Sequence, residues 1–308
     1  MEKINRREFI RKSAVAGAAS IFGGSILSSH GLLHAAGQID LSVVKGQNYF
    51  KNTVKAVEQL GGMRKFVSKG AKVGILANTP FTNPGTHTNP DIVLAIVKMC
   101  FDAEAKEVCW LKNPPDEYCE KSSVASELGE EIKKLKLSSE NYAIHKIQKG
   151  IALKKAEIVN ELFECDVFIN IPVSKHHEGT NFSCCLKNVM GAAPHSTNRF
   201  FHSGSGTPGW YGDIDHTNQC IADVNLIRNP TLCVVDATEF ISTNGPFGPG
   251  KIVRPQKVVA GTDPVLADAY CSTLMGLDPG TVGMIGKAVK HGLGTADLGK
   301  ANILETEV

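Results

Sequence analysis

The chain has 308 residues and a mass of 33.0 kDa; 42% of its residues are hydrophobic and 21% are charged. This composition is that of an ordinary globular protein, and the length suffices for one large core or two modest ones. The net charge is only +2, and the chain has no basic stripe of the kind that follows a phosphate backbone, which excludes nucleic acid as a partner.

The N-terminus predicts export. Arg6 and Arg7 precede a moderately apolar stretch, 14–27, that is rich in Ala, Gly and Ser. This arrangement is typical of a Tat signal, and the alternative is a cytosolic basic helix. We interpret residues 1–36 as a Tat signal peptide, or as an uncleaved anchor because His34-Ala35-Ala36 only partly fits a cleavage site. The expected location is the periplasm or the outer face of the cytoplasmic membrane, with the Tat translocase as a partner during export.

Residues 37–308 alternate short apolar runs with amphipathic segments. Pro90 and Pro264 open two of the helical patterns. Continuous apolar strands that alternate with helices predict a single α/β domain with a mixed, mostly parallel sheet flanked by helices. The strand-like runs are 73–77, 107–111, 166–171, 231–236 and 258–260.

Two segments depart from this alternation. Residues 112–150 are charged and contain few strand signals, so we expect a small helical insertion with a solvated face. Residues 192–218 are rich in Pro, Gly, Ser and Asn and include Trp210 and Tyr211. A long irregular stretch inside a compact domain is usually a functional loop or a disordered one. The aromatic residues and the histidines favour a functional loop.

The nine cysteines lie mostly within apolar runs, which favours small buried hydrophobic residues. No Cys-x-x-Cys occurs, which argues against a ferredoxin-type cluster held by one loop, while a cluster built from dispersed cysteines stays open. The vicinal pair Cys184-Cys185 favours two buried thiols, with a redox switch or a pair of metal ligands as the alternative.

Polar side chains follow several predicted strands directly. In open α/β sheets ligands bind outside the carboxyl ends of the strands, so the fold would bring these side chains to one rim. They are Asn78, Lys175, His176, His177, Asp236, Thr262 and Asp263.

The histidines are concentrated in one part of the chain. Five of the ten fall between His176 and His216. Imidazole and carboxylate groups together suit zinc, iron, nickel or manganese. The alternative is that these imidazoles hydrogen-bond an irregular loop or act as acids and bases without a metal. The predicted metal ligands are His176, His177, His202, His216 and Asp236.

A second group combines cations with an amide and a buried carboxylate. Lys175 and Lys187 offer positive charge and Asn188 a two-way hydrogen-bonding amide, which suits a carboxylate or another oxyanion. The alternative is a solvated Lys187 and a turn-capping Asn188. Asp268 lies among apolar residues, where a carboxylate is costly without a partner. A lysine, histidine or metal partner would make it a site residue, and a helix-end contact would make it structural.

Residues 261–264, Gly-Thr-Asp-Pro, have a structural explanation of their own. Asp263 is a good helix N-cap, and Pro264 is a good first helical residue. A function for Thr262 or Asp263 is therefore optional.

Taken in order, these motifs resemble the domain of unknown function 362 family. The resemblance runs from about Val43 to Gly294. It is carried by a strand ending at Pro172, by Lys175 with its histidines, by Lys-Asn-Val-Met-Gly at 187–191, by Asp236 with the Gly-Pro loop 244–250, and by 261–268. Members often have Lys-Pro-Asn after the first strand. Here the sequence is Leu-Ala-Asn, which loses a cation beside Asn78.

Clustering and this resemblance together predict the site and its chemistry. The leading hypothesis is an exported protein that depends on a transition metal or is associated with an iron–sulfur cluster, an oxidoreductase acting on a small anionic molecule. The alternative is a non-catalytic anion-binding or cofactor-assembly protein for an exported redox complex. Metal-free isomerisation or hydrolysis lacks a nucleophile motif. The predicted catalytic residues are Lys175, Lys187, Asn188 and Asp268, and the predicted substrate-binding residues are Asn78, Gly191, Thr262 and Asp263.

Overall fold

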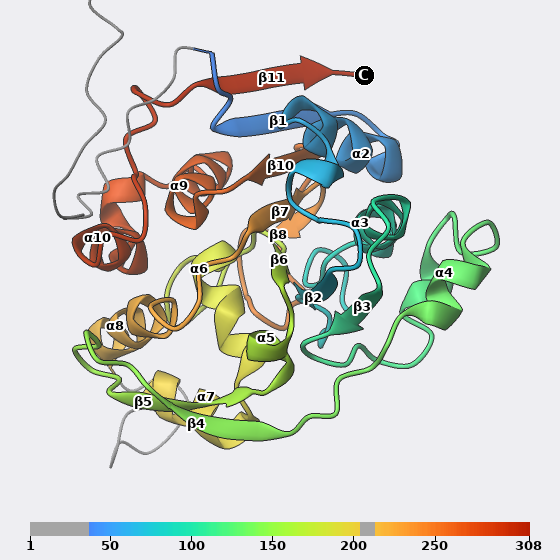
Figure 1. The fold of residues 1–308 in the computed structure, drawn as a ribbon. Coiled ribbons are helices and arrows are strands. Elements are labelled where there is room, and N and C mark those ends of the chain that lie inside the picture. Colours follow the sequence, from blue (N-terminus) through green and yellow to red (C-terminus); the bar gives the residue numbers. More distant parts are fainter. Residues whose placement is uncertain (1–36, 204–212) are drawn as a thin grey trace, which may run out of the picture. The chain divides into compact units, whose positions relative to one another are not determined.

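The computed structural model describes residues 37–203 and 213–308 (Figure 1). The predicted Tat segment, 1–36, lies outside the described residues, as do Trp210 and Tyr211. None of the helices in the described ranges is both long enough and apolar enough to cross a bilayer.

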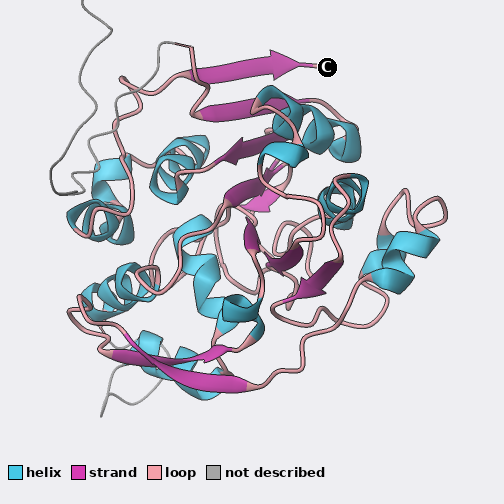
Figure 2. Cartoon of the chain, in the orientation of Figure 1, coloured by secondary structure: helices cyan, strands magenta, loops and turns pink. Residues whose placement is uncertain are grey.

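A seven-stranded sheet with the order β11-β1-β10-β7-β6-β2-β3 forms the centre of the fold (Figure 2). Neighbours in the block β7, β6, β2 and β3 are parallel, whereas β10 runs antiparallel between β7 and β1. The predicted mixed, mostly parallel sheet is confirmed. Its strands are β1 (Leu41–Lys45), β2 (Lys72–Ala77), β3 (Glu107–Trp110), β6 (Val167–Ile171), β7 (Leu232–Ala237), β10 (Lys257–Gly261) and β11 (Ile303–Glu307).

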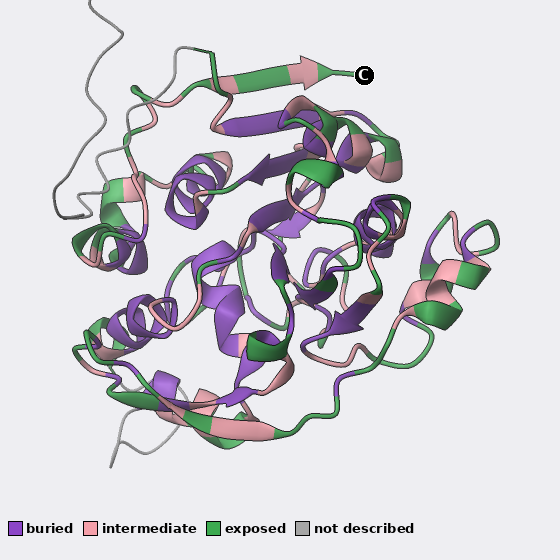
Figure 3. Cartoon of the chain, in the orientation of Figure 1, coloured by how far each residue is buried: buried purple, intermediate pink, exposed green. Residues whose placement is uncertain are grey.

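Helices cover both faces of this sheet, so the central strands are buried throughout (Figure 3). Successive residues of β7 belong to opposite cores: Val234 packs in the core with α2 (Tyr49–Gln59) and α3 (Pro90–Asp102), and Val235 in the other core. The longer helices of that other core include α8 (Ile214–Val224), α9 (Pro264–Leu274) and α10 (Gly283–Lys290), and the short helix α6 (Cys185–Asn188) also packs there.

Two of these helices begin where the sequence places them. The side chain of Asn89 accepts a hydrogen bond from the Asp91 N–H, and α3 starts at Pro90. Asp263 accepts from two backbone N–H groups in the first turn of α9, which starts at Pro264. A capping side chain followed by a proline with its fixed φ therefore sets both starts.

The predicted helical insertion, 112–150, needs a correction. It contains the short helix α4 (Gly129–Lys134), but it also contains β4 (Tyr142–Lys146), which pairs antiparallel with β5 (Lys155–Val159). The five residues of β4 are half-buried or exposed, so they lack the continuous apolar run that marks a buried strand. The remaining short elements of the described chain are η1 (Met63–Lys65), η2 (Cys119–Lys121), α5 (Glu161–Glu164), β8 (Phe240–Ile241), β9 (Ile252–Val253) and η4 (Pro279–Thr281).

The segment expected as an irregular functional loop, 192–218, is largely helical where it is described. The turn η3 (Val189–Ala192) leads into α7 (His195–Ser203), and α8 begins after the N-cap Asp213. Ser, Asn and His are weak helix formers, so the local sequence hides α7. Burial of Phe201 in the core stabilises this helix instead.

Candidate functional site

A cavity of about 450 Å³ opens beyond the carboxyl ends of β2 and β6. Asn78 enters it directly after β2, and Lys175 enters it after β6. Segments that are far apart in the sequence meet here because parallel strands end at the same edge of the sheet. The site residues predicted from the sequence that line this cavity are Asn78, Lys175, His177, Lys187, Asn188, Gly191 and His202.

Lys175 is almost completely buried, with 1% of its surface exposed. Its Nζ donates to Asn78 Oδ1 at 3.0 Å and to the backbone oxygen of Thr86, and it lies 4.2 Å from the centre of the Phe81 ring. Burial, and then the charge of Lys187, lower the pKa of Lys175 well below its usual value. The Lys175 amine therefore has a fixed position, but among the described residues no anionic partner offsets its desolvation.

A chain of amides extends from Lys175 into the core. Asn78 Nδ2 donates to Asn188 Oδ1 at 3.3 Å, and Asn188 Nδ2 donates to Asn170 Oδ1 at 2.7 Å and to the Leu76 carbonyl at 2.9 Å. Asn188 is 5% exposed and Asn170 is fully buried. This network holds one wall of the cavity, and with it the position of the Lys175 ammonium.

Lys187, in the last turn of α6, is the second buried cation. Its Nζ lies 3.0 Å from Nε2 of His202, on α7, and 3.6 Å from Met190 Sδ. Desolvation by burial lowers the pKa of Lys187 to about 7. The amine can therefore gain or lose its proton near neutral pH.

His202 and His177 stack on each other with ring centres 5.6 Å apart. His202 Nδ1 lies 2.8 Å from the Asn198 carbonyl, an acceptor, so this nitrogen carries the proton and Nε2 presents its lone pair to Lys187. Burial, followed by the charge of Lys187, lowers the pKa of His202 to about 3. The same two causes lower the pKa of His177 well below its usual value. Both imidazoles are therefore neutral at pH 7.

The lining of the cavity contains cations and amides but neither Asp nor Glu. In the described part of the chain, no ion pair joins Lys175 or Lys187 to a carboxylate. A buried charge is stable only when it is paired, so an anion that entered the cavity would supply the missing partner.

Two aromatic rings stand at the cavity. Phe81 and Phe247 meet edge to face, with centroids 5.1 Å apart and planes at 86°. Phe247 is 60% exposed, which is high for a ring of this size. It comes from the Gly-Pro loop 244–250, where a Cβ on Gly245 would lie 1.9 Å from the His176 carbonyl oxygen. Glycine at 245 therefore allows the loop to approach the cavity.

Three predicted metal ligands lie outside this cavity. His176 Nδ1 accepts from the Gly245 N–H at 3.0 Å, and His216 lies against Cys220 and the Phe200 carbonyl. Asp236 accepts three hydrogen bonds, from the Asn89 N–H and from the N–H and hydroxyl of Thr238. Burial raises the pKa of Asp236 to about 6. These contacts give the three residues structural partners in the described chain, and their metal roles stay a prediction.

The ring nitrogens of His177 and His202 that could bind a metal already have partners in the described chain. A metal ion needs an imidazole lone pair, and the lone pair of His177 Nδ1 already accepts from the Gly179 N–H at 3.1 Å. That of His202 Nε2 faces Lys187. Within 37–203 and 213–308, the residues that do bring three donor atoms within 4.8 Å of one another are Cys184, Cys185 and Asp268.

The remaining predicted residues have structural roles in the described chain. Thr262 is exposed, and Asp263 caps α9 while also accepting from the Thr295 N–H. Asp268 is fully buried and accepts from the N–H groups of Cys185 and Leu186 at the start of α6. The helix-end contact is thus the partner of Asp268, and neither Lys187 nor a histidine contacts it.

Sequence reasoning missed several lining residues. Asn198 and Met190 hold His202 and Lys187 in position, and Phe81 and Phe247 shape the opening. Asn170 supports the wall from the core. An aromatic residue inside the Gly-Pro loop was the available signal for Phe247. Asn198 gave none, because its contribution is a backbone carbonyl.

The family model described as "Domain of unknown function (DUF362)" matches residues 72–273. No curated protein matches the chain.

Two solved structures are similar at low identity. The lactate racemase apoprotein from Thermoanaerobacterium thermosaccharolyticum is 14% identical, with a TM-score of 0.45 over 73% of this chain and 54% of that chain. A Thermotoga maritima protein solved by the Northeast Structural Genomics Consortium is 15% identical, with a TM-score of 0.39 over 62% of this chain and 51% of that chain. The chain thus spans about half the length of each, and a likeness at this level does not carry over a reaction.

Proposed function

The chain belongs to the domain of unknown function 362 family, and we propose that it binds a small anionic molecule in the 450 Å³ cavity and transfers a proton to or from it through Lys187. One observation carries this proposal. Lys175 and Lys187 are buried in the lining of the cavity, and the described lining residues include no carboxylate to pair with them. A carboxylate-bearing small molecule supplies both the charge and the acceptors that these ammonium groups need.

The two lysines have different roles in this proposal. Lys175 is held by Asn78 and Thr86, so its ammonium is positioned to orient an anionic oxygen. Lys187, with a pKa of about 7, can take up or release a proton at neutral pH. His202 stays neutral and accepts a hydrogen bond from Lys187, which aligns the amine.

A narrower proposal is that this proton transfer serves an oxidoreductase. No side chain in the lining accepts electrons. A transition metal or an iron–sulfur cluster of a partner in an exported redox complex would therefore receive them. We place this centre on the partner because the lone pairs of His177 Nδ1 and His202 Nε2 already have partners in the described chain.

The second candidate is a non-catalytic anion-binding or cofactor-assembly protein. The fixed position of Lys175 favours it, because the contacts with Asn78 and Thr86 prepare the site for binding without any proton transfer. The two candidates differ at Lys187, which a binding protein would not need in its uncharged form.

We expect Lys175→Met to weaken the binding of small carboxylates by about 10- to 100-fold, since a hydrogen bond to a charged group contributes roughly 1.5–3 kcal/mol. Isothermal titration calorimetry with pyruvate and oxalate measures this, and inorganic phosphate tests whether the preference is for carboxylates. Lys98→Met is the matched control, because Lys98 pairs with Asp102 on α3 and does not line the cavity. Unchanged affinity in Lys175→Met, or no anion binding by the wild type, would contradict the proposal.

We further propose export by the Tat pathway, on the strength of Arg6 and Arg7 ahead of the apolar stretch. A reporter fused to residues 1–36 is expected to reach the periplasm in wild-type cells and to stay in the cytoplasm of cells that lack the Tat translocase. Replacing both arginines with Lys should block export. Localisation that does not depend on the translocase would refute this proposal.

A further inference from the structure

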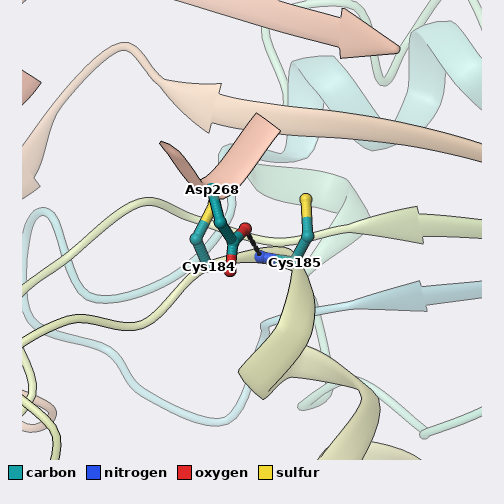
Figure 4. A group of neighbouring side chains, drawn as sticks. All are labelled: Cys184, Cys185 and Asp268. Carbon is teal, nitrogen blue, oxygen red and sulfur yellow. Dashed lines mark hydrogen bonds between the residues drawn. The ribbon is translucent and has the colours of Figure 1, made fainter. Parts of the chain in front are cut away.

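A cluster of two thiols and a carboxylate lies at the start of α6, outside the cavity. The thiols of Cys184 and Cys185 and one carboxylate oxygen of Asp268 all lie within 4.8 Å of one another. Figure 4 shows the carboxylate between the two cysteines, with Asp268 reaching across from α9. All three residues are fully buried.

The carboxylate in this cluster has no cationic partner in the described chain. Its two oxygens accept from the Cys185 N–H at 2.7 Å and from the Leu186 N–H at 3.1 Å. The Cys184 thiol is a third hydrogen-bonding partner of this carboxyl group, so one of its roughly four acceptor positions remains. Backbone N–H groups satisfy part of its hydrogen bonding but bring no full positive charge, and a buried charge is stable only when it is paired. A bound cation would provide that charge.

A fourth donor stands next to this set. Cys271 follows Asp268 by one turn of α9, and its thiol lies beside that of Cys184. Three thiols and one carboxylate make a four-ligand set of the kind that holds zinc in structural sites. The thiol donors exclude Mg²⁺ and Ca²⁺, which prefer oxygen ligands.

We propose that Cys184, Cys185, Asp268 and Cys271 bind one Zn²⁺ ion, and that this ion fixes the start of α6. Each thiol that coordinates the ion loses its proton to solvent, so binding releases protons. The three donors that lie within 4.8 Å of one another can enclose a single ion, with Cys271 reaching it from beside Cys184, whereas an iron–sulfur cluster separates its terminal thiolates further. The last turn of α6 carries Lys187 and Asn188, so the metal would position two residues that line the cavity.

The proposal is tested on the wild-type chain. The protein is produced in zinc-containing medium and purified under reducing conditions without chelators. We expect about one zinc per chain by elemental analysis. X-ray absorption at the zinc edge should show a first shell dominated by sulfur. A zinc-free protein that also takes up no Zn²⁺ on refolding would overturn the proposal, and so would a first shell made only of nitrogen and oxygen.

Variants then identify the ligands. Cys184→Ser and Cys271→Ser should each reduce the bound zinc at least tenfold, while Cys100→Ser, which removes an equally buried thiol from α3, should keep it. If the ligand variants fail to fold, the sulfur-rich shell of the wild type still supports the site. Full zinc retention in both folded variants would contradict it. The proposal is separable from the proposed function, because carboxylate binding by the cavity is measured without reference to zinc.

Discussion

Replacing Lys187 with Met is expected to stabilise the protein at pH 7 and to destabilise it near pH 10. Burial lowers the pKa of Lys187 from 10.5 to about 7, so between these values the unfolded chain binds a proton that the folded chain does not. Stability from this group therefore rises with pH across that window. Titration of Lys187 therefore makes the free energy of unfolding of the wild type about 4 kcal/mol lower at pH 7 than at high pH. A Met side chain does not titrate and has no such penalty.

The loss of a hydrogen bond opposes this gain in the free energy of unfolding, and it does so at every pH. Without the amine, Nε2 of His202 loses its partner, which costs roughly 1–3 kcal/mol. The expected net change in the free energy of unfolding is thus a gain of about 2 kcal/mol at pH 7 that declines and reverses towards pH 10. A stabilising change at a buried polar residue is the behaviour expected when function, and not stability, retains that residue.

Urea unfolding of the wild type and Lys187→Met at pH 7, 8.5 and 10 measures this difference. Lys133→Met is the control: Lys133 is exposed on α4, so its variant should differ from the wild type by the same small amount at every pH. A difference for Lys187→Met that stays constant with pH would show that this amine does not titrate in that range. The acid–base role proposed for it would then fail.

Asp268→Ala is expected to lower the free energy of unfolding by about 3–5 kcal/mol at pH 7. The change leaves two buried N–H groups, of Cys185 and Leu186, without acceptors, at roughly 1–3 kcal/mol each, and it opens a small cavity between α6 and α9. Since Asp268 is fully buried, water does not replace the lost acceptor.

Urea unfolding again provides the measurement. Asp278→Ala is the matched control, because Asp278 accepts a single, exposed hydrogen bond at the start of η4, and it should cost about 1 kcal/mol or less. A loss below 1 kcal/mol for Asp268→Ala would contradict the capping role. Repeating the wild-type measurement with added Zn²⁺ separates the contribution of the carboxylate from that of the ion.

The sequence predicted which residues line the cavity better than it predicted what they do there. Asn78 and Lys175 follow the ends of β2 and β6, and parallel topology brings such positions to one edge. Lys187 and Asn188 lie on α6 and were predicted from their side-chain chemistry and the family motif. The predicted set of metal ligands is not brought together around one point in the described chain, for a different reason. The spacing of histidines along the chain does not predict which partner each ring nitrogen has. In His177 the Nδ1 lone pair accepts from a backbone N–H, and in His202 the Nε2 lone pair faces Lys187.

By itself, the sequence determined the alternation of buried strands and helices, the starts of α3 and α9 at their capping residues, and the family. These features depend on local patterns, namely apolar runs, N-caps and prolines, and short motifs. The tertiary structure alone decided that β10 is antiparallel, that α7 is helical, and that Asp268 meets α6 and not the cavity. It also decided the charge state of Lys187, because desolvation depends on every residue that surrounds the amine and not on its neighbours in the chain.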